Sequence, residues 1–235
     1  MYSCDLNIHG IRVRIRTRKQ EEIRRLESFC GLFLVPIGPE PESGAELTDE
    51  DELDLLSFLA RHDIFAFHAA AYQNGSGKGI FLPGGAASGK TTIAFSALSS
   101  GYPFVSDDVT LCRQEGKDFS LLPFKTYLNL KQDGRGLIYN VLEHYPKDVF
   151  GSTHARVIVF PEIVTEDESS IKRVDDRRTI FAGLLKTAVW VGDNVLRRRQ
   201  ASVLEGLCSL PAYSLFLGND HKRRPQLAIE LLDRI

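Results

Sequence analysis

Residues 84–91 read Gly-Gly-Ala-Ala-Ser-Gly-Lys-Thr and fit the pattern G-x-x-x-x-G-K-[ST]. Glycines let such a loop curl so that successive backbone N–H groups point at phosphate oxygens. In this pattern the Lys90 ammonium group reaches the β- and γ-phosphates of a nucleotide, and the Thr91 hydroxyl ligates Mg²⁺. A helix beginning near Lys90 adds the positive end of its dipole. The predicted phosphate site comprises Gly84, Gly85, Ala86, Ala87, Ser88, Gly89, Lys90, Thr91 and Thr92.

The residues around the loop favour this interpretation. An apolar strand over residues 80–82 precedes the loop, and an apolar helix with Ile93, Ala97 and Leu98 follows it. By composition alone, a chain of this length matches the pattern about once in a hundred. A plain glycine turn is the alternative, and the strand–loop–helix context disfavours it.

Two adjacent aspartates, Asp107 and Asp108, come next. Gly101 and Pro103 end the helix, and Phe104-Val105 reads as a short buried strand that carries the aspartates at its carboxyl end. In a right-handed β-α-β unit that end lies beside the phosphate loop. One carboxylate could then hold Mg²⁺, directly or through water, while the other accepts a proton from an attacking hydroxyl. The alternative is a simple Asx turn at a strand end.

His68 lies among small apolar residues, on a strand that enters a hairpin before the loop. A lone histidine in such a setting is more often a core residue than a catalytic one. Its residue type alone leaves both readings open.

Taken together, His68, the 84–91 loop and an aspartate pair only about 15 residues beyond the loop resemble the HPr kinase/phosphorylase family. The shorter HPr-kinase-like proteins of bacteria resemble the chain more closely, and the PEP carboxykinases share this type of nucleotide core. The resemblance implies ATP and Mg²⁺ as cofactors. It also implies Thr91, Asp107 and Asp108 as metal ligands, and Asp107, Asp108, His68 and Lys90 as catalytic residues.

The chain departs from that family in three places. Thr91 stands where those kinases usually have serine, which preserves the hydroxyl ligand. The family's Glu-x-Arg-Gly segment is not reproduced, because residues 128–131 and 134–137 lack the glutamate. The large N-terminal domain of the full-length enzymes is replaced by about 60 residues of strands and helices. The resemblance therefore implies kinase action without implying phosphorolysis or HPr itself as substrate.

We expect an ATP- and Mg²⁺-dependent kinase whose acceptor is a hydroxyl, foremost a serine of a protein or peptide. Two alternatives stay open at the level of sequence. One is a kinase of a small metabolite, which differs only in its acceptor. The other is a regulatory module that binds a nucleotide and transfers nothing.

Composition excludes several classes of protein. The chain has 235 residues, a formal net charge of −2 and a hydrophobic fraction of 43%, which are typical of a folded globular chain. The balanced charge gives no field for non-specific binding of nucleic acid or an anionic membrane. No apolar run or N-terminal leader indicates a membrane span or secretion, and four scattered cysteines form no metal pattern. We expect a cytoplasmic protein, and the resemblance is compatible with a homo-oligomer.

The expected fold is α/β, a phosphate-loop core of the HPr kinase/PEP carboxykinase type with β-hairpins. A small N-terminal α+β subdomain would cover residues 1–60 and the nucleotide-binding domain residues 61–235. Alternation in the first 17 residues predicts one strand, followed by a helix over 19–30 and a strand over 32–35. Residues 36–44 read as a linker, and Thr48 with Asp51 as the cap of a helix reaching Leu59. Later predictions are a hairpin of 109–113 with 119–122, a strand over 154–161 ended by Pro161, helices over 177–185, 197–210 and 227–232, and a strand over 213–217.

Several basic residues remain as weaker candidates. Lys131 could be a second cation at the phosphates, and Arg177 or Arg178 could stabilise a transition state. Residues 197–199 are three consecutive arginines, and a solvated helix face is the default reading because neighbouring helical residues point in different directions. His221 and its basic neighbours could contact a ligand, with a polar loop as the alternative.

Overall fold

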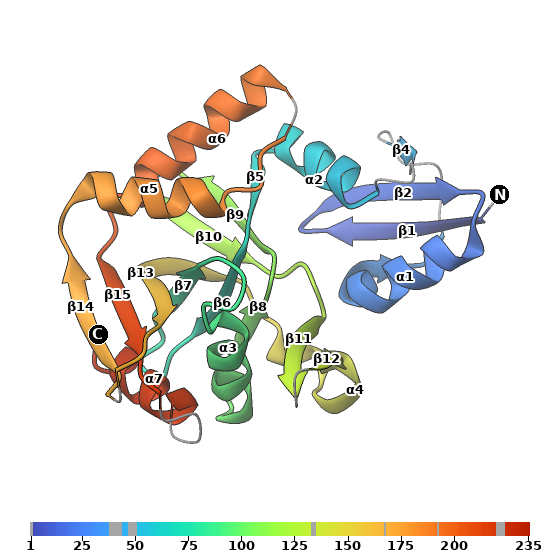
Figure 1. Ribbon diagram of the computed structural model, residues 1–235. Coiled ribbons are helices and arrows are strands. Elements are labelled where there is room, and N and C mark those ends of the chain that lie inside the picture. Colours follow the sequence, from blue (N-terminus) through green and yellow to red (C-terminus); the bar gives the residue numbers. More distant parts are fainter. Residues whose placement is uncertain are drawn as a thin grey trace.

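A computed structural model of the chain describes residues 2–37, 44–46, 51–132, 135–166, 168–191, 193–219 and 224–235. Its fold is mixed α/β. A small N-terminal sheet lies to one side of a large curled sheet that helices cover on both faces (Figure 1).

The small sheet has the strand order β3-β1-β2-β4. Strands β1 (Tyr2–Ile8) and β2 (Ile11–Thr17) are antiparallel and turn at His9 and Gly10, both with positive φ. The alternating segment is therefore two strands, and the prediction of one strand is wrong. The apolar positions change from even (Leu6, Ile8) to odd (Ile11, Val13) across the turn, and this change of phase separates the two strands. The other elements are α1 (Gln20–Cys30), the 3₁₀ turn η1 (Gly31–Phe33), β3 (Leu34–Val35), β4 (Gly44–Glu46) and α2 (Asp51–Arg61).

Both predicted helices of this part are confirmed, within a residue or two at their ends. The proposed cap Thr48 and most of the proposed linker lie outside the described residues.

The large sheet runs in the order β5-β9-β10-β13-β7-β6-β8, with β15 beside β13 and β14 beside β15. The predicted hairpin of residues 109–122 is present as β9 and β10. Strand β6 lies antiparallel between β7 and β8, so β7 and β8 are parallel to each other, as the predicted β-α-β unit requires. The strands are β5 (Ile64–Phe67), β6 (Ala69–Gln73), β7 (Gly79–Pro83), β8 (Phe104–Ser106), β9 (Thr110–Glu115), β10 (Asp118–Leu122), β13 (Thr153–Ile163), β14 (Ser170–Val174) and β15 (Ala212–Leu217).

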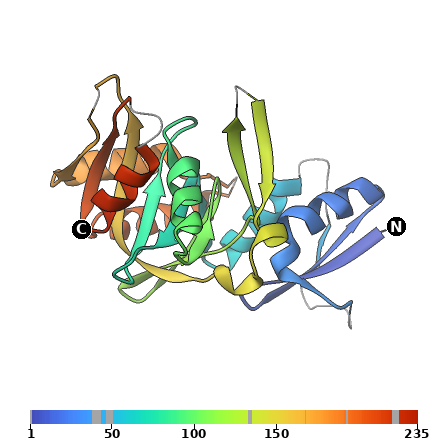
Figure 2. The same cartoon turned by 90° about the horizontal axis from the view of Figure 1, so that it is seen from below.

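A β-hairpin stands apart from both sheets, formed by β11 (Tyr127–Gln132) and β12 (Arg135–Asn140) (Figure 2). It is followed by the short helix α4 (Val141–His144) and the 3₁₀ turn η2 (Lys147–Val149).

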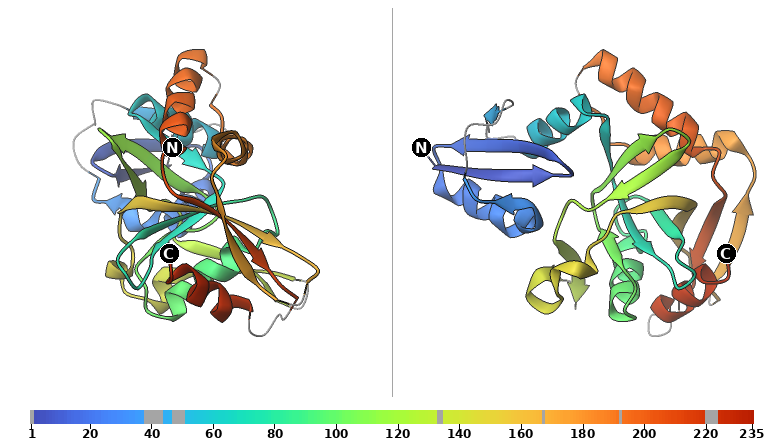
Figure 3. Two further views of the ribbon diagram at one scale, coloured as in Figure 1. Left: turned by 90° about the vertical axis from the view of Figure 1, so that its left-hand side faces the viewer. Right: turned by 180° about the vertical axis from the view of Figure 1, so that it is seen from behind.

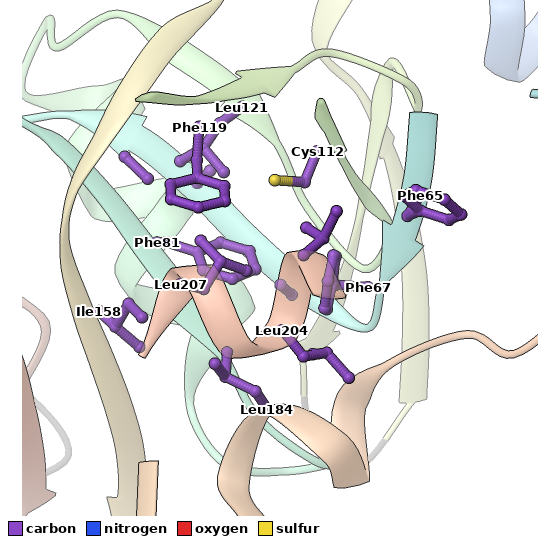
Figure 4. Close-up of a cluster of buried hydrophobic side chains, with 14 of the residues drawn as sticks. Phe65, Phe67, Phe81, Cys112, Phe119, Leu121, Ile158, Leu184, Leu204 and Leu207 are labelled. Carbon is purple, nitrogen blue, oxygen red and sulfur yellow. The ribbon is translucent and has the colours of Figure 1, made fainter. Parts of the chain in front are cut away.

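Helices cover the two faces of the large sheet. Helices α5 (Arg177–Thr187) and α6 (Asn194–Leu207) pack on one face, and α3 (Lys90–Ser99) and α7 (Arg224–Leu232) on the other. Strand β7 shows why both faces are apolar: Phe81 points into the cluster under α5 and α6, while Ile80 and Leu82 point into the cluster under α3 and α7. Figure 4 shows the first cluster, with phenylalanines of the sheet facing Leu204 and Leu207 of α6.

Strand β13 continues through Pro161 to Ile163, so the prediction that the proline ends it is wrong. The amide nitrogens of Ile158 and Val164 both donate to the β15 side of the strand. By alternation the nitrogen of Pro161 faces the other side, where pairing with β7 ends at Ile158. The missing N–H therefore breaks no ladder bond.

The N-terminal part and the large sheet share one buried cluster, in which Leu6, Val13 and Leu26 meet Leu111 and Phe124. The view from behind in Figure 3 shows the two parts side by side. The division of the chain at residue 60 stays a prediction. Among the described residues, no helix is both long and apolar enough to cross a membrane.

Candidate functional site

The loop 84–89 connects the end of β7 to the start of α3, as predicted. Gly89 precedes α3 with φ +99°, a conformation that glycine adopts without steric cost. A Cβ atom at Gly89 would lie 2.5 Å from Leu217 Cδ1. Two separate constraints therefore require glycine at this position.

The Lys90 side chain closes the loop on itself. Its Nζ donates to the carbonyl oxygen of Gly85 at 2.7 Å, and the side chain is buried. Burial lowers the pKa of Lys90, while Asp107 and Asp108 act in the opposite direction. The buried Ser88 hydroxyl has no hydrogen-bond partner among the described residues, and Thr92 is exposed. A buried cation and an unsatisfied hydroxyl in a glycine loop suit an anionic ligand.

Asp107 directly follows β8, and its side chain is fully buried. Neither carboxylate oxygen has a well-formed hydrogen bond within the described chain, although the Thr91 hydroxyl and the Asp108 amide lie close enough to lower the pKa. Burial outweighs them and raises the pKa of Asp107 to about 6. A buried carboxylate beside Thr91, with both oxygens unsatisfied, fits a divalent cation ligand.

Asp108 lies in a different environment. The Val109 N–H donates to the Asp107 carbonyl oxygen at 2.7 Å, so Asp108 is the central residue of a γ-turn with φ +64°. Among the described residues, the Asp108 carboxylate has partners that the Asp107 carboxylate lacks. Its Oδ1 lies 3.1 Å from His68 Nε2, and its Oδ2 accepts from Lys125 Nζ at 2.9 Å. The His68 hydrogen bond and the Lys125 charge hold the pKa of Asp108 well below its usual range.

His68 occupies the break between β5 and β6. Its backbone N–H donates to the Thr187 carbonyl oxygen at 2.7 Å, and its own carbonyl accepts from the Gly84 N–H at 3.3 Å. The main chain therefore ties His68 to the first glycine of the loop. Its side chain is 37% exposed, so the reading of His68 as a core residue does not hold.

Lys125 is the residue of this cluster that the sequence analysis missed. Only 5% of the residue is exposed, and its Nζ also lies 5.6 Å from the Tyr127 ring centroid. It belongs to no motif and lies 17 residues beyond Asp108. The signal that could have found it is a lone lysine after the apolar run 121–124, since a lysine buried there needs a carboxylate partner.

The weaker candidates do not join this cluster in the described structure. Arg177 donates to the Glu205 carbonyl oxygen at 3.0 Å, and Arg178 is exposed. The three arginines of α6 diverge: Arg197 donates to the Val191 carbonyl oxygen, and Arg199 pairs with Asp63. The Lys131 side chain and His221 lie outside what the structure describes.

The described residues offer few ligands for a cation. Among the described residues, no group of three or more His, Cys, Asp and Glu side chains could hold a metal ion. Asp107 and Thr91 can supply two oxygen ligands, and phosphate oxygens of a bound nucleotide would have to supply others. Asp108 is engaged with His68 and Lys125 instead.

The fold and site define a class: a mixed α/β protein in which a phosphate-loop sequence lies between a strand and a helix, beside two carboxylates in unlike environments. Among solved structures, the chain is similar to the Hpr(Ser) kinase/phosphatase from Coxiella burnetii, with 15% identity and a TM-score of 0.45 over 72% of this chain and 88% of that chain. No family model and no curated protein matches the chain.

Proposed function

We propose that this protein transfers the γ-phosphoryl group of ATP to a hydroxyl group, with a serine of a protein or peptide as the acceptor. The observation that carries the proposal is that two adjacent carboxylates lie in unlike environments. Asp107 is buried and unsatisfied beside Lys90 and Thr91, whereas Asp108 is hydrogen-bonded to His68 and Lys125. A kinase needs one carboxylate on the nucleotide side and one on the acceptor side.

On the nucleotide side, the loop N–H groups and Lys90 bind the phosphates. Lys90 gives up its bond to the Gly85 carbonyl oxygen to do so, and the buried position of its ammonium group strengthens its attraction for phosphate. Mg²⁺ would be held by Asp107 and Thr91, and it would neutralise charge on the β- and γ-phosphates.

On the acceptor side, Asp108 is the base. As the acceptor oxygen bonds to the γ-phosphorus, the bond from that phosphorus to the bridging oxygen breaks and ADP leaves. The acceptor proton passes to the Asp108 carboxylate. His68 and Lys125 are positioning residues, because their bonds to the two oxygens fix the carboxylate in one orientation.

The test is transfer of label from γ-labelled ATP, with Mg²⁺, into a lysate whose protein and small-molecule fractions are resolved separately. We expect a labelled protein or peptide with the wild-type chain and none with Lys90→Ala. Asp108→Asn should abolish labelling while ATP affinity, measured by calorimetry, stays within about twofold.

The other outcomes each have a meaning. Label that appears only in a small molecule would replace the peptide acceptor by a metabolite. ATP binding without any labelled species would overturn the kinase and favour the nucleotide-binding regulatory module. Loss of ATP binding in Asp108→Asn would contradict the role of Asp108 on the acceptor side.

A further inference from the structure

We infer that the nucleoside end of the nucleotide lies over the carboxyl ends of β13 and β15, with the exposed Ile163 side chain as its apolar contact surface. This inference rests on the proposed nucleotide binding and goes beyond it, because no motif of the sequence addresses the base or the ribose.

The order of the strands in the large sheet gives the direction in which the nucleotide extends from the phosphate loop. The aspartate pair follows β8, which lies two strands from β7 on one side, and β13 and β15 lie on the other side of β7. The γ-phosphate must point towards the aspartates for transfer to occur. The rest of the nucleotide then extends the opposite way, over β13 and β15, whose carboxyl ends share the loop's edge because both strands are parallel to β7.

Ile163 lies at the carboxyl end of β13, where the nucleoside would pass. It is the last residue of β13 and is 44% exposed, so its side chain offers apolar surface to a ligand at the carboxyl end of the strand. Its Cγ1 lies 3.9 Å from the position that a Cβ of Gly89 would take, and the Leu217 side chain lies closer still. The exposed side chain of Ile163 thus lies beside the last glycine of the phosphate loop, over the buried Leu217.

Hydrogen bonds fix the backbone at Val164 and Gly218, next to Ile163. The Val164 N–H donates to the Leu217 carbonyl oxygen at 3.1 Å, and the Gly218 N–H donates to Ser169 Oγ at 3.0 Å. The Gly218 carbonyl oxygen accepts from Arg224 Nε at 2.6 Å. A surface fixed in this way loses little entropy when a ligand packs on it.

Arg224 supplies a second, polar indication. The residue is 8% exposed, and its Nη2 has no hydrogen-bond partner among the described residues. A buried guanidinium N–H without an acceptor is costly. The bond to Gly218 holds the guanidinium group near the carboxyl end of β15, and a ribose hydroxyl oxygen would satisfy Nη2 once the group turns outward on binding.

The experiment compares ATP with inorganic tripolyphosphate, both with Mg²⁺, by calorimetry. Tripolyphosphate carries the phosphates without the nucleoside. We expect the wild-type chain to bind ATP more tightly than tripolyphosphate. Ile163→Ser should weaken ATP binding about fivefold, as expected for losing roughly 40 Å² of apolar contact, and leave tripolyphosphate binding unchanged. The matched control is Leu185→Ser, which alters a similarly exposed aliphatic residue on α5 and should change neither affinity.

A second variant, Arg224→Lys, keeps the charge and removes the planar fork; with its melting temperature checked, it should also weaken ATP alone. Equal wild-type affinities for the two ligands, or an Ile163→Ser effect that is the same on both, would overturn the inference while leaving the proposed function intact. A wild-type chain that binds neither ligand would instead overturn the proposed function.

Discussion

At the scale of single residues, the informative feature is that two neighbouring aspartates have pKa values shifted in opposite directions. Burial raises the pKa of Asp107, and the bonds to His68 and Lys125 lower the pKa of Asp108. Such divergence is typical of carboxylates with different tasks in one site. In the proposed function, the unsatisfied Asp107 is the cation ligand and the firmly held, ionised Asp108 faces the acceptor.

The pKa of Asp107 predicts a pH dependence of stability. Its folded-state value of about 6 lies above the ordinary 3.8, so ionising Asp107 costs more in the folded than in the unfolded protein. The stability tied to Asp107 is present in full below the unfolded pKa and is lost as the pH rises through about 6. Without divalent cations, the free energy of unfolding should fall by about 2 kcal/mol from this source between roughly pH 4.5 and 7.5.

Asp107→Asn cannot ionise, so this fall should be missing from its urea unfolding curves. The comparison of variant with wild type cancels every other titrating group. Asp175→Asn, at a position that is 77% exposed, should follow the wild-type dependence. A wild-type and Asp107→Asn difference that stays constant across this pH range would show that Asp107 is not held in a desolvated state.

The sequence was sufficient to predict the position of residues that belong to a local motif. The 84–91 loop and the aspartate pair lie where the pattern predicts, because a strand, a glycine turn and a helix are encoded within a few residues of each other. The apolar run before Lys125 hints at a buried lysine, but its pairing with Asp108 could not be predicted, since that contact arises only when β9 and β10 return the chain to the site. The opposite environments of the two aspartates depend on the γ-turn, which likewise has no signature in the sequence.

At the scale of elements, the loop conformation depends on Gly89. Gly89→Ala forces an L residue to φ +99° and brings a methyl group against Leu217. We expect a loss of about 1–3 kcal/mol, and therefore a melting temperature lower by several degrees. ATP binding should be lost with it, because the start of α3 has to move.

Gly85→Ala is the matched control within the same loop. A Cβ atom there meets nothing within 4 Å, and Gly85 is not among the residues with positive φ. Its melting temperature should stay within about a degree of the wild-type value, as measured by thermal unfolding without ligand. Equal destabilisation by the two substitutions would mean that the loop does not hold the described conformation in solution.

Other elements show where pattern reading fails. Pro161 predicts the end of a strand, yet β13 runs past it because the side of the strand that loses an N–H has no partner there. For Pro161 the deciding factor is which strand lies beside it, and the local sequence does not contain this. The N-terminal hairpin is different, because the apolar positions change phase between Ile8 and Ile11 and the local sequence therefore does mark its turn.

At the scale of the whole molecule, the N-terminal part supports the segment that carries Lys125. His9 Nε2 lies 2.7 Å from the Pro123 carbonyl oxygen, and the Thr126 hydroxyl donates to the Ser28 carbonyl oxygen at 3.0 Å. Phe124, between them, is fully buried in the cluster shared with the small sheet. The residues on both sides of Lys125 are therefore held by β1–β2 and α1, while the phosphate loop has no such tie in the described contacts.

This arrangement predicts that Thr126→Val impairs transfer without impairing ATP binding. Valine keeps the shape of a threonine that is 0% exposed and removes the bond to Ser28, at a cost of about 1 kcal/mol. Because Lys125 then holds Asp108 less firmly, we expect turnover to fall severalfold while the dissociation constant for ATP is unchanged. Thr17→Val is the control: it removes the hydrogen bonds of the Thr17 hydroxyl with Glu22 and with the Lys19 N–H, both inside the N-terminal part. It should therefore lower stability at least as much and leave turnover at the wild-type rate. If both variants slow transfer equally, the effect is one of general stability, and the N-terminal part does not act on the site through residues 123–126.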